Sequence, residues 1–182
     1  MRLFTGLALD EKTTDISGAF VSRIQRGFPT LRWSPPQQWH VTLQFLGEVK
    51  DDRYSCIVER LQAVRTHAVE VRLAAPDFFE RAGVFHIAIE KTETLLALHR
   101  VTQQALLQCG FVPEARPYSP HITLARNKGR APSSDLERLR REVEKHAPVK
   151  FPPFVAREFL LYQSFTEPSG PRYEVRERFA LM

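Results

Sequence analysis

The sequence predicts an α+β fold whose sheets are antiparallel or mixed. Segments with helical and with strand periodicity alternate along the 182 residues, and the last two expected strands are joined by a short turn. In addition, the chain carries an internal similarity between its two halves. Because 43% of the residues are hydrophobic, the chain can bury the core of one compact domain or of two small lobes.

The first strand and the first helix are predicted from the spacing of apolar residues. A strand is expected at residues 3–9, where apolar and β-forming side chains dominate. Ile16, Phe20 and Ile24 then recur at every fourth position, which places them on one face of a helix. We expect this helix to end by Gly27.

Two prolines introduce the next strand. A short extended piece at 31–33 leads to Pro35 and Pro36, which exclude a helix there. Apolar and polar residues alternate over 39–46, which predicts a strand, and we expect Gly47 to end it.

The remaining elements follow from the same rules. Breakers such as Gly110 and the prolines between 113 and 120 separate the periodic segments. The expected elements are a helix at 51–67 capped by Asp51 or Asp52, strands at 69–75 and 84–90, a helix at 94–109, a strand at 121–126, a polar helix at 133–146, and strands at 154–163 and 173–181.

The two halves of the chain match when the sequence is shifted by 81 positions. The shift places Phe4 on Phe85, Pro36 on Pro117, His40 on His121, Thr42 on Thr123 and Leu43 on Leu124. Both copies run from strand to helix, proline-bearing connection, strand and helix, as a duplicated unit would. We therefore expect one domain, residues 1–182, made of two pseudo-symmetric lobes; a coincidence of short motifs is the alternative.

Composition and charge narrow the classes of function. The net charge of +5 and a pI near 9.5 suit an anionic partner such as RNA or a nucleotide, although many proteins carry a similar excess. The apolar start is too short for a signal peptide and no segment is long enough for a membrane span, so we expect a cytoplasmic protein without membrane contact. Cys56 and Cys109 lack metal or redox spacing and are expected to be reduced and inert.

Two short motifs carry the candidate chemistry: WHVTLQF around His40 and PHITLAR around His121. On a strand, side chains two positions apart point the same way, so each histidine shares a face with the threonine that follows it, Thr42 or Thr123. The aliphatic residues between them point into the core. Each strand would thus present an imidazole and a hydroxyl on a rigid element.

A pair of such motifs suits phosphate chemistry. An imidazole titrates near neutrality, so one histidine can act as an acid and the other as a base. Threonine hydroxyls can donate hydrogen bonds to phosphate oxygens from two sides. One His-x-Thr motif is weak support, because strand histidines are usually structural, but two with the same aliphatic and leucine neighbours are strong support.

The motifs HVTL and HITL resemble the duplicated signatures of the 2H phosphoesterase superfamily. With RLFTGLAL, WHVTLQFLGEV and PHITLAR, nearly the whole chain resembles the RNA 2′,3′-cyclic phosphodiesterases, historically called 2′-5′ RNA ligases. This resemblance implies a bilobal α+β fold with a central cleft and outer helices, and no metal or other cofactor.

The resemblance also implies roles for residues. The catalytic residues would be His40, as proton donor, and His121, as proton acceptor, while Thr42, Thr123 and Arg126 would bind phosphate. The substrate would be RNA or a nucleotide with a 2′,3′-cyclic phosphate, opened to a 2′-phosphomonoester, and 2′-5′ ligation would be the reverse reaction. We expect a monomer.

Other functions are also compatible with the sequence. The motifs suit hydrolysis of small cyclic nucleotides or ADP-ribose cyclic phosphate, and a duplicated fold could be a non-catalytic nucleotide- or RNA-binding module, although both motifs are intact.

We expect Phe4 in the core and His86 at the surface, and leave Trp33 and Tyr118 open between packing and base stacking. The arginine-rich helix at 133–146 is expected to be a solvated face, and no zinc spacing joins His67, His99 and His146.

Overall fold

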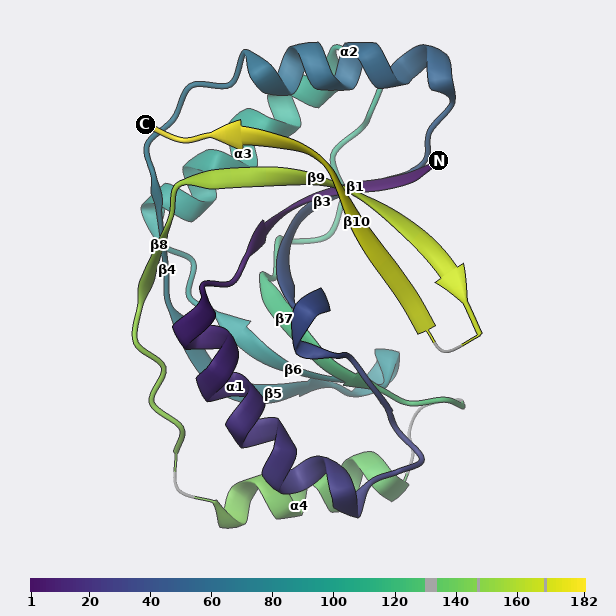
Figure 1. Ribbon diagram of the computed structural model, residues 1–182, viewed down its shortest axis with the longest axis vertical. Helices are drawn as coiled ribbons and strands as arrows, with labels where there is room; N and C mark the ends of the chain where they lie inside the picture. Colours follow the sequence, from purple (N-terminus) through teal and green to yellow (C-terminus); the bar gives the residue numbers. More distant parts are fainter. Residues whose placement is uncertain (130–133, 147, 169) are drawn as a thin grey trace.

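The computed structural model describes residues 1–129, 134–146, 148–168 and 170–182, and it confirms the α+β class. Two four-stranded sheets and one two-stranded sheet, all antiparallel, form the centre of the described molecule (Figure 1). Sheet A has the order β10 (Gly170–Ala180), β9 (Glu158–Glu167), β1 (Arg2–Ala8) and β3 (His40–Glu48); sheet B has the order β2 (Arg32–Trp33), β7 (His121–Arg126), β6 (Val84–Ile89) and β5 (Leu73–Phe79); β4 (Val69–Val71) pairs with β8 (Phe154–Ala156).

Helices cover the outside of both sheets. They are α1 (Glu11–Ile24), α2 (Asp51–Gln62), α3 (Glu93–Leu107) and α4 (Ser134–Lys145), and short 3-10 turns are η1 (Gln25–Gly27), η2 (Pro36–Gln38) and η3 (Glu80–Ala82). Figure 1 shows α2 and α3 together at one end of the molecule and α1 and α4 at the other.

The helices are exchanged between the two sheets. Helix α1 follows β1 of sheet A, yet its Phe20 ring lies 6.4 Å from the ring of Phe85 in β6 of sheet B. Helix α3 follows β6 of sheet B, yet it packs against α2 and β3 at the sheet A end. Each end of the molecule is therefore built from both halves of the sequence.

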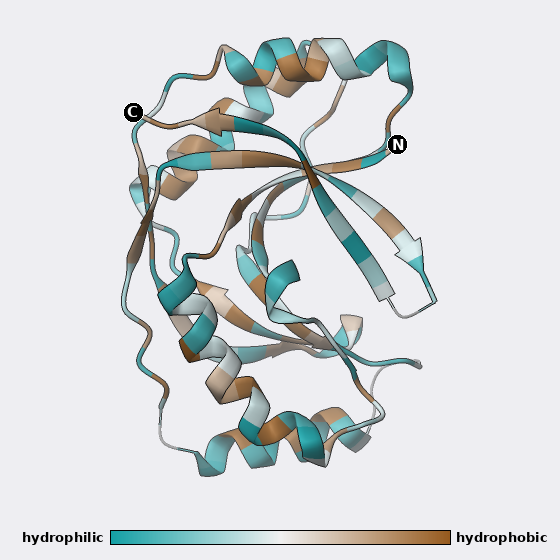
Figure 2. Cartoon of the chain, viewed as in Figure 1, coloured by the Kyte–Doolittle hydropathy of each residue, from teal (hydrophilic) through white to brown (hydrophobic). Residues whose placement is uncertain are grey.

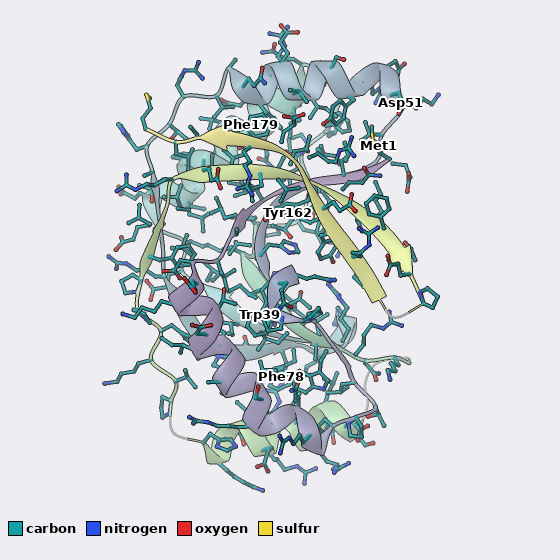
Figure 3. All side chains as sticks on the ribbon, in the orientation of Figure 1. Met1, Trp39, Asp51, Phe78, Tyr162 and Phe179 are labelled. Carbon is teal, nitrogen blue, oxygen red and sulfur yellow. A yellow bond between two sulfur atoms is a disulfide. The ribbon has the colours of Figure 1, made fainter. Side chains whose placement is uncertain are left out.

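One continuous hydrophobic core runs through both ends. It joins residues such as Leu3 and Ile57 at the sheet A end to Ile87 and Leu139 at the sheet B end. Hydrophobic and hydrophilic residues alternate in the helices, and much of β10 is hydrophilic (Figure 2). Side chains fill the space between the layers, with Phe179 near the end formed by α2 and α3 and Phe78 toward the end formed by α1 and α4 (Figure 3). The fold is thus bilobal with a shared core.

Several expected boundaries were wrong. Strand β3 continues through Gly47, whose positive φ of 67° accommodates a register shift against β1. Pro36 begins a 3-10 turn, because proline is accepted in the first turn of a helix. The N-cap residue of α2 is Lys50 rather than Asp51 or Asp52, and the helix ends at Gln62 rather than near 67.

Two further segments differ from expectation at their boundaries. The segment expected as one strand at 69–75 is divided into β4 and β5, which pair with different partners. Ser133, expected to begin the polar helix, lies outside the described residues, and the described helix α4 begins at Ser134. Helix α4 carries ion pairs between residues three positions apart, Arg138 with Asp135 and Lys145 with Glu142.

The expectation for the cysteines was wrong. Cys56 and Cys109 form a disulfide with their Cα atoms 5.9 Å apart. Cys56 lies in α2 and Cys109 just after α3, and the packing of these two helices brings together residues that are 53 positions apart. Because this pairing depends on the exchange of α3 between the sheets, spacing along the sequence gave no sign of it.

Candidate active site

Strands β3 and β7 place both motifs at the junction between the sheets. Alternation buries the aliphatic residues, so that Val41 and Ile122 are fully buried, and turns the histidines and threonines toward the cleft. The two strands belong to different sheets and approach each other where the sheets meet. The Tyr118 hydroxyl donates to the Thr42 carbonyl at 3.0 Å and thereby links the segment before β7 to β3.

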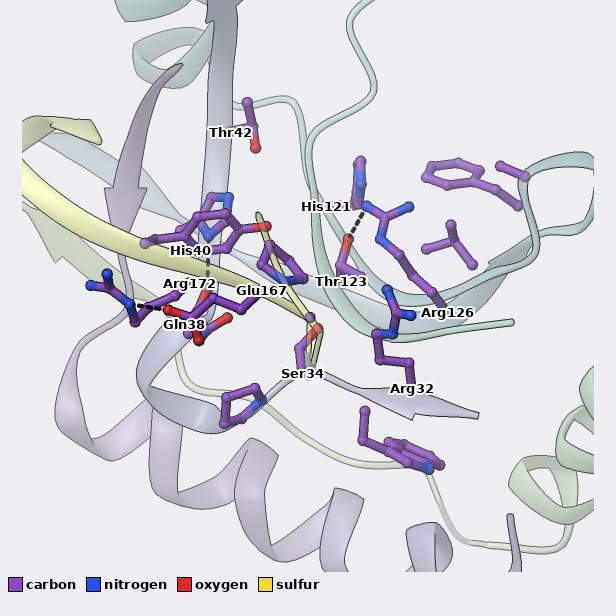
Figure 4. A pocket seen from close by; sticks show the side chains of 18 of the residues that line it. Arg32, Ser34, Gln38, His40, Thr42, His121, Thr123, Arg126, Glu167 and Arg172 are labelled. Atoms are coloured by element: carbon purple, nitrogen blue, oxygen red, sulfur yellow. Dashed lines mark hydrogen bonds and ion pairs between the residues drawn. The ribbon is translucent and has the colours of Figure 1, made fainter. Parts of the chain in front are cut away.

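A cleft of about 380 Å³ lies between these strands. Its lining contains all five residues expected from the sequence: His40, Thr42, His121, Thr123 and Arg126 (Figure 4). The volume lies at the lower end of the range of small-ligand sites, about 300 to 1,000 Å³, and suits a single nucleotide better than a larger group.

The two imidazoles are held in the same way. In each, Nδ1 lies 2.8 Å from the backbone carbonyl two residues earlier, that of Gln38 for His40 and that of Ser119 for His121. Because a carbonyl can only accept, Nδ1 must carry the hydrogen in both rings. In both neutral rings Nε2 is therefore the unprotonated nitrogen, the atom able to exchange a proton with a ligand in the cleft.

The surroundings of His40 are apolar. Its ring centroid lies 4.7 Å from that of Phe4 and 5.0 Å from that of Tyr173. Burial lowers the pKa of His40 to about 4, and the charges of His121 and Arg126 act in the same direction, against the bond to Gln38. The apolar walls therefore keep His40 neutral in the free protein and make its imidazolium a strong acid.

The surroundings of His121 include a third histidine. His86, expected at the surface, is instead buried, and its ring stacks on Phe79 at 3.9 Å and lies 5.3 Å from that of His121. Alternation holds in β6, since Phe85 and Ile87 face the core, but the opposite face is covered by the rings of Phe79 and His121 rather than by solvent. Burial lowers the pKa of His86 to about 4 and also lowers the pKa of His121.

Arginines supply the positive charge of the cleft. Arg126 donates to the hydroxyl oxygen of Thr123 at 3.4 Å, which leaves that hydroxyl's own proton for a ligand. Arg32 is the register partner of Arg126 across β2 and β7, and both line the cleft (Figure 4). Like charges directly opposite each other repel, so this pair is suited to an anion between them. Arg32 was not expected from the sequence, because a two-residue strand gives no periodic signal.

The hairpin of β9 and β10 completes the lining. Arg172 is bound by Glu167 at 2.6 Å and by Glu174, so its charge is largely compensated, and Tyr173 lies against His40. These residues are about 130 positions from His40 in the sequence, and pairing of β9 with β1 brings them in. Long-range pairing of this kind has no local sequence signal.

The aromatic residues near the cleft are anchored by the protein itself. Phe4 packs in the core, as expected, although it also contacts His40. Trp33, left open from the sequence, donates from Nε1 to the Phe28 carbonyl at 3.0 Å while lining the cleft. Tyr118, also left open, stacks on His99 at 3.8 Å. Packing thus fixes the position of all three rings.

Neither a metal cluster nor a membrane span is found within the described part of the chain. It contains no group of three or more histidine, cysteine, aspartate or glutamate side chains able to hold a metal ion. None of its helices combines the length and the apolar character that a membrane span needs.

Comparison with known families agrees with this geometry. Residues 15–157, more than half of the chain, match the model of the 2′-5′ RNA ligase superfamily. The chain belongs to this superfamily. The matched residues of the 2′-5′ RNA ligase superfamily include both pairs of histidine and threonine.

Two relatives of the chain carry the same description. An RNA 2′,3′-cyclic phosphodiesterase of Geobacillus stearothermophilus is 28% identical over 185 residues, covering 98% of this chain but 57% of the relative, so the chain spans little more than half of that protein. An RNA 2′,3′-cyclic phosphodiesterase of Thermus thermophilus is 30% identical over 195 residues, covering 100% of this chain and 90% of the relative.

A solved structure shows the same architecture. The crystal structure of TT0787 of Thermus thermophilus matches with a TM-score of 0.80 and 27% identity, covering 99% of this chain and 97% of that chain. The bilobal arrangement of two sheets with exchanged helices is therefore a fold already seen in a solved protein.

Proposed function

We propose that this protein hydrolyses RNA 2′,3′-cyclic phosphate ends to 2′-phosphomonoesters, with His40 as general acid and His121 as general base. The observation that carries the proposal is the matched pair of imidazoles. Each has Nδ1 held by a backbone carbonyl just before its own strand and Nε2 available in one cleft beside Thr42 and Thr123. The relatives named RNA 2′,3′-cyclic phosphodiesterase support the same reaction.

The proposed reaction is an in-line displacement at phosphorus. Nε2 of His121 takes a proton from water as the water oxygen bonds to phosphorus, and the bond from phosphorus to the ribose 3′ oxygen breaks. Nε2–H of His40 gives its proton to that leaving oxygen. The threonine hydroxyls donate to the non-bridging oxygens, and Arg126 with Arg32 balances the charge. The same steps with a ribose 5′ hydroxyl in place of water give 2′-5′ ligation.

The assignment of the two roles rests on the resemblance of the motifs HVTL and HITL to the duplicated signatures of the family, because burial and the charge of Arg126 lower the pKa of both histidines. The pKa of His40 is lowered to about 4, so a proton that this ring gains as the substrate binds is readily released to the leaving oxygen. The lowered pKa of His121 keeps its Nε2 free to accept a proton. The two pseudo-symmetric lobes of the proposed single domain, residues 1–182, each supply one histidine, so that the two rings flank the phosphate.

Histidine variants test the proposal. His40→Ala and His121→Ala should each lower kcat by about 10² to 10⁴, and the double variant should lose little more, because the pair acts as a unit. His67→Ala, an exposed histidine away from the cleft, is the matched control and should retain activity. Near-wild-type activity in either cleft variant contradicts the proposal.

A modified substrate separates the two roles. A cyclic phosphate with sulfur in place of the bridging 3′ oxygen has a leaving group that needs no proton. It should restore much of the rate of His40→Ala and little of that of His121→Ala. Equal restoration, or restoration of His121→Ala alone, shows that the roles are assigned wrongly, and a 3′-phosphate product shows that the ribose binds in the reverse orientation.

The proposed reaction uses proton transfer and hydrogen-bond donors from side chains. Turnover should therefore persist after dialysis against EDTA, and activity lost to the chelator and restored by one metal ion would contradict this mechanism. The cytoplasmic location and the monomeric state expected from the sequence stay predictions. Cell fractionation tests the first, and light scattering tests the second.

A further inference from the structure

His86 lies behind the proposed base rather than in the lining of the cleft. It belongs to β6, where it faces Thr123 of β7, and only 2% of its surface is exposed. A ring buried to this extent does not reach a ligand in the cleft. His86 can therefore affect the reaction only through the side chains that it contacts.

The rings of Phe79, His86 and His121 form a compact group. Phe79 and His86 are stacked, with ring centroids 3.9 Å apart and planes at 17°. The centroid of His121 lies 4.8 Å from that of Phe79 and 5.3 Å from that of His86, with interplanar angles of 86° and 71°. Because these two distances are similar, His121 lies beside the stack, against the edges of both rings. The stack thus restricts rotation of the His121 imidazole.

The first motif has no corresponding imidazole behind its histidine. In both sheets an alanine of the neighbouring strand faces the histidine of the motif. The residue that faces the threonine of the motif is Gly6 in sheet A and His86 in sheet B. Phe4 and Tyr173 pack against His40 instead. The pseudo-symmetric strand pairs therefore differ at the one position that contacts the proposed base.

The edge of the His86 ring differs chemically from that of a phenylalanine. The edge of a benzene ring carries a partial positive charge, whereas a neutral imidazole has one ring nitrogen with a free lone pair. Nδ1 of His86 is buried and has no hydrogen-bond partner of normal geometry among the described residues. Because an unpartnered buried nitrogen destabilises a fold, a phenylalanine at this position would make the protein more stable.

The environment of His86 keeps its ring uncharged near neutrality. Burial lowers the pKa of His86 to about 4, and His121 acts in the same direction, while Asp77, the partner of His86 in β5, acts against them. Burial and the charge of Arg126 lower the pKa of His121, and across the cleft burial lowers that of His40. An uncharged polar ring thus lies against the ring that must take up a proton.

We propose that His86 is a positioning residue, which fixes the plane of the His121 ring and stabilises the positive charge that this ring gains when it takes a proton from water. The proton moves from water to Nε2 of His121, and His86 neither gains nor loses one. This inference rests on the proposed function and adds a residue to it.

The variant His86→Phe tests the inference, because it keeps a flat ring on Phe79 and removes the polar edge. Its Tm should equal or exceed that of the wild type, whereas the pKa of His121 should fall by about half a pH unit or more. NMR titration of the histidine rings in the free protein measures this pKa, with the signal assigned by its loss in His121→Ala. A purely structural role of His86 would not change it.

A kinetic measurement isolates the same effect on the base. In His40→Ala acting on the substrate with a 3′ bridging sulfur, His121 is the group that transfers a proton. The rate then falls as the pH drops through the pKa of His121. Addition of His86→Phe should move this fall to lower pH and should reduce the plateau rate by about 10-fold, with little change in KM.

His99→Phe is the matched control, because it makes the same substitution in another stacked histidine. His99 stacks on Tyr118 with centroids 3.8 Å apart, and burial lowers its pKa as well. This control should leave the pKa of His121 and kcat at their wild-type values. An unchanged or raised pKa of His121 in His86→Phe, or an equal shift in His99→Phe, overturns the inference. Failure of the wild type to open any 2′,3′-cyclic phosphate overturns the proposed function instead, whatever the NMR titration gives.

Discussion

At the residue scale, the two histidines make the same kind of backbone contact but lie among different side chains. Each ring donates from Nδ1 to a carbonyl two residues earlier, just before its strand, but His40 is enclosed by Phe4 and Tyr173, whereas His121 lies beside Phe79 and His86. Burial is the largest cause of the lowered pKa in both. The free cleft therefore holds two neutral imidazoles near neutrality, and the proposed catalytic pair must gain its proton as the anion binds.

The pH dependence should reveal this coupling. The reaction needs one proton on the pair, and both pKa values lie below 6.5 in the free protein, so kcat/KM should peak below pH 6.5 and fall toward alkaline pH. A bound phosphodiester anion favours the protonated rings and raises their pKa, so the kcat profile should lie at higher pH. Steady-state rates across the pH range measure both profiles. Coincident profiles centred above pH 6.5 would contradict the coupling.

The facing arginines lead to a second prediction. Because Arg32 and Arg126 repel across the strand pair, Arg32→Gln should leave Tm unchanged or raise it slightly. The unfolding free energy should rise by at most about 1 kcal/mol. The same change should raise KM, and inorganic phosphate should stabilise the variant less than the wild type. Thermal unfolding with and without phosphate measures this. Arg26→Gln, exposed and outside the cleft, is the control; a marked loss of stability in Arg32→Gln would show a structural role instead.

Strand alternation, a local rule, predicted that each histidine shares a face with its threonine. The meeting of both motifs and Arg126 in one cleft was expected from the resemblance to the family. The sequence could not predict the place of Arg32, which depends on the pairing of β2 with β7. It also could not predict the burial of His86, which depends on the Phe79 ring that stacks on it. Tyr173 enters the cleft through the pairing of distant strands. Cross-strand register, rather than side-chain chemistry, marks the limit of what could be predicted here.

At the element scale, the close approach of β1 to β3 positions His40. A Cβ atom added at Gly6 would lie 2.8 Å from the Val41 carbonyl oxygen and 3.6 Å from Cδ2 of His40. Cβ atoms essentially never come within 3.0 Å of another heavy atom, so any other residue forces the strands apart. The absence of a side chain at this position thus sets the depth at which the imidazole is buried.

Gly6→Ala should therefore impair both stability and catalysis. We expect a loss of about 1 to 3 kcal/mol in unfolding free energy, as for overpacking, and a fall in kcat larger than the change in KM, because the acid is displaced. Gly18→Ala is the matched control: it lies in α1 with no atom within 4 Å of the added Cβ, and it should be neutral or stabilising. Equal behaviour of the two variants would show that the close approach is unimportant.

Most helices and strands could be predicted, because periodicity and breakers are local. The errors have physical causes: Gly47 was expected to end β3, but a glycine with positive φ can also sit in a bulge within a strand. Strands β4 and β5 could not be separated, because their division depends on partners far along the chain.

At the scale of the whole molecule, the exchange of α1 and α3 makes the halves of the chain interdependent. The disulfide between Cys56 and Cys109 adds a covalent link between the same two halves. Two lobes were expected from the sequence but the exchange of helices was not, since no local pattern specifies which sheet a helix covers.

Reduction of the disulfide should destabilise the protein. For a separation of 53 residues, the chain-entropy model gives about 4 kcal/mol, so a reductant should lower Tm by roughly 10 °C. Calorimetry with and without dithiothreitol measures the shift. The double variant Cys56→Ser, Cys109→Ser should already melt lower and show no response to reductant. Titration of two free thiols in the untreated, unfolded protein would contradict the bond.

The contacts that hold the two imidazoles have a consequence for how this protein tolerates change. Gln38 and Ser119 contribute main-chain oxygens, not side chains, to His40 and His121. Every amino acid has such an oxygen, so drift at these two positions leaves the proton arrangement of both rings intact as long as the backbone keeps its path. The tautomer of each ring is therefore set by the backbone conformation. For this tautomer, the amino-acid identity matters at the two histidines and not at positions 38 and 119.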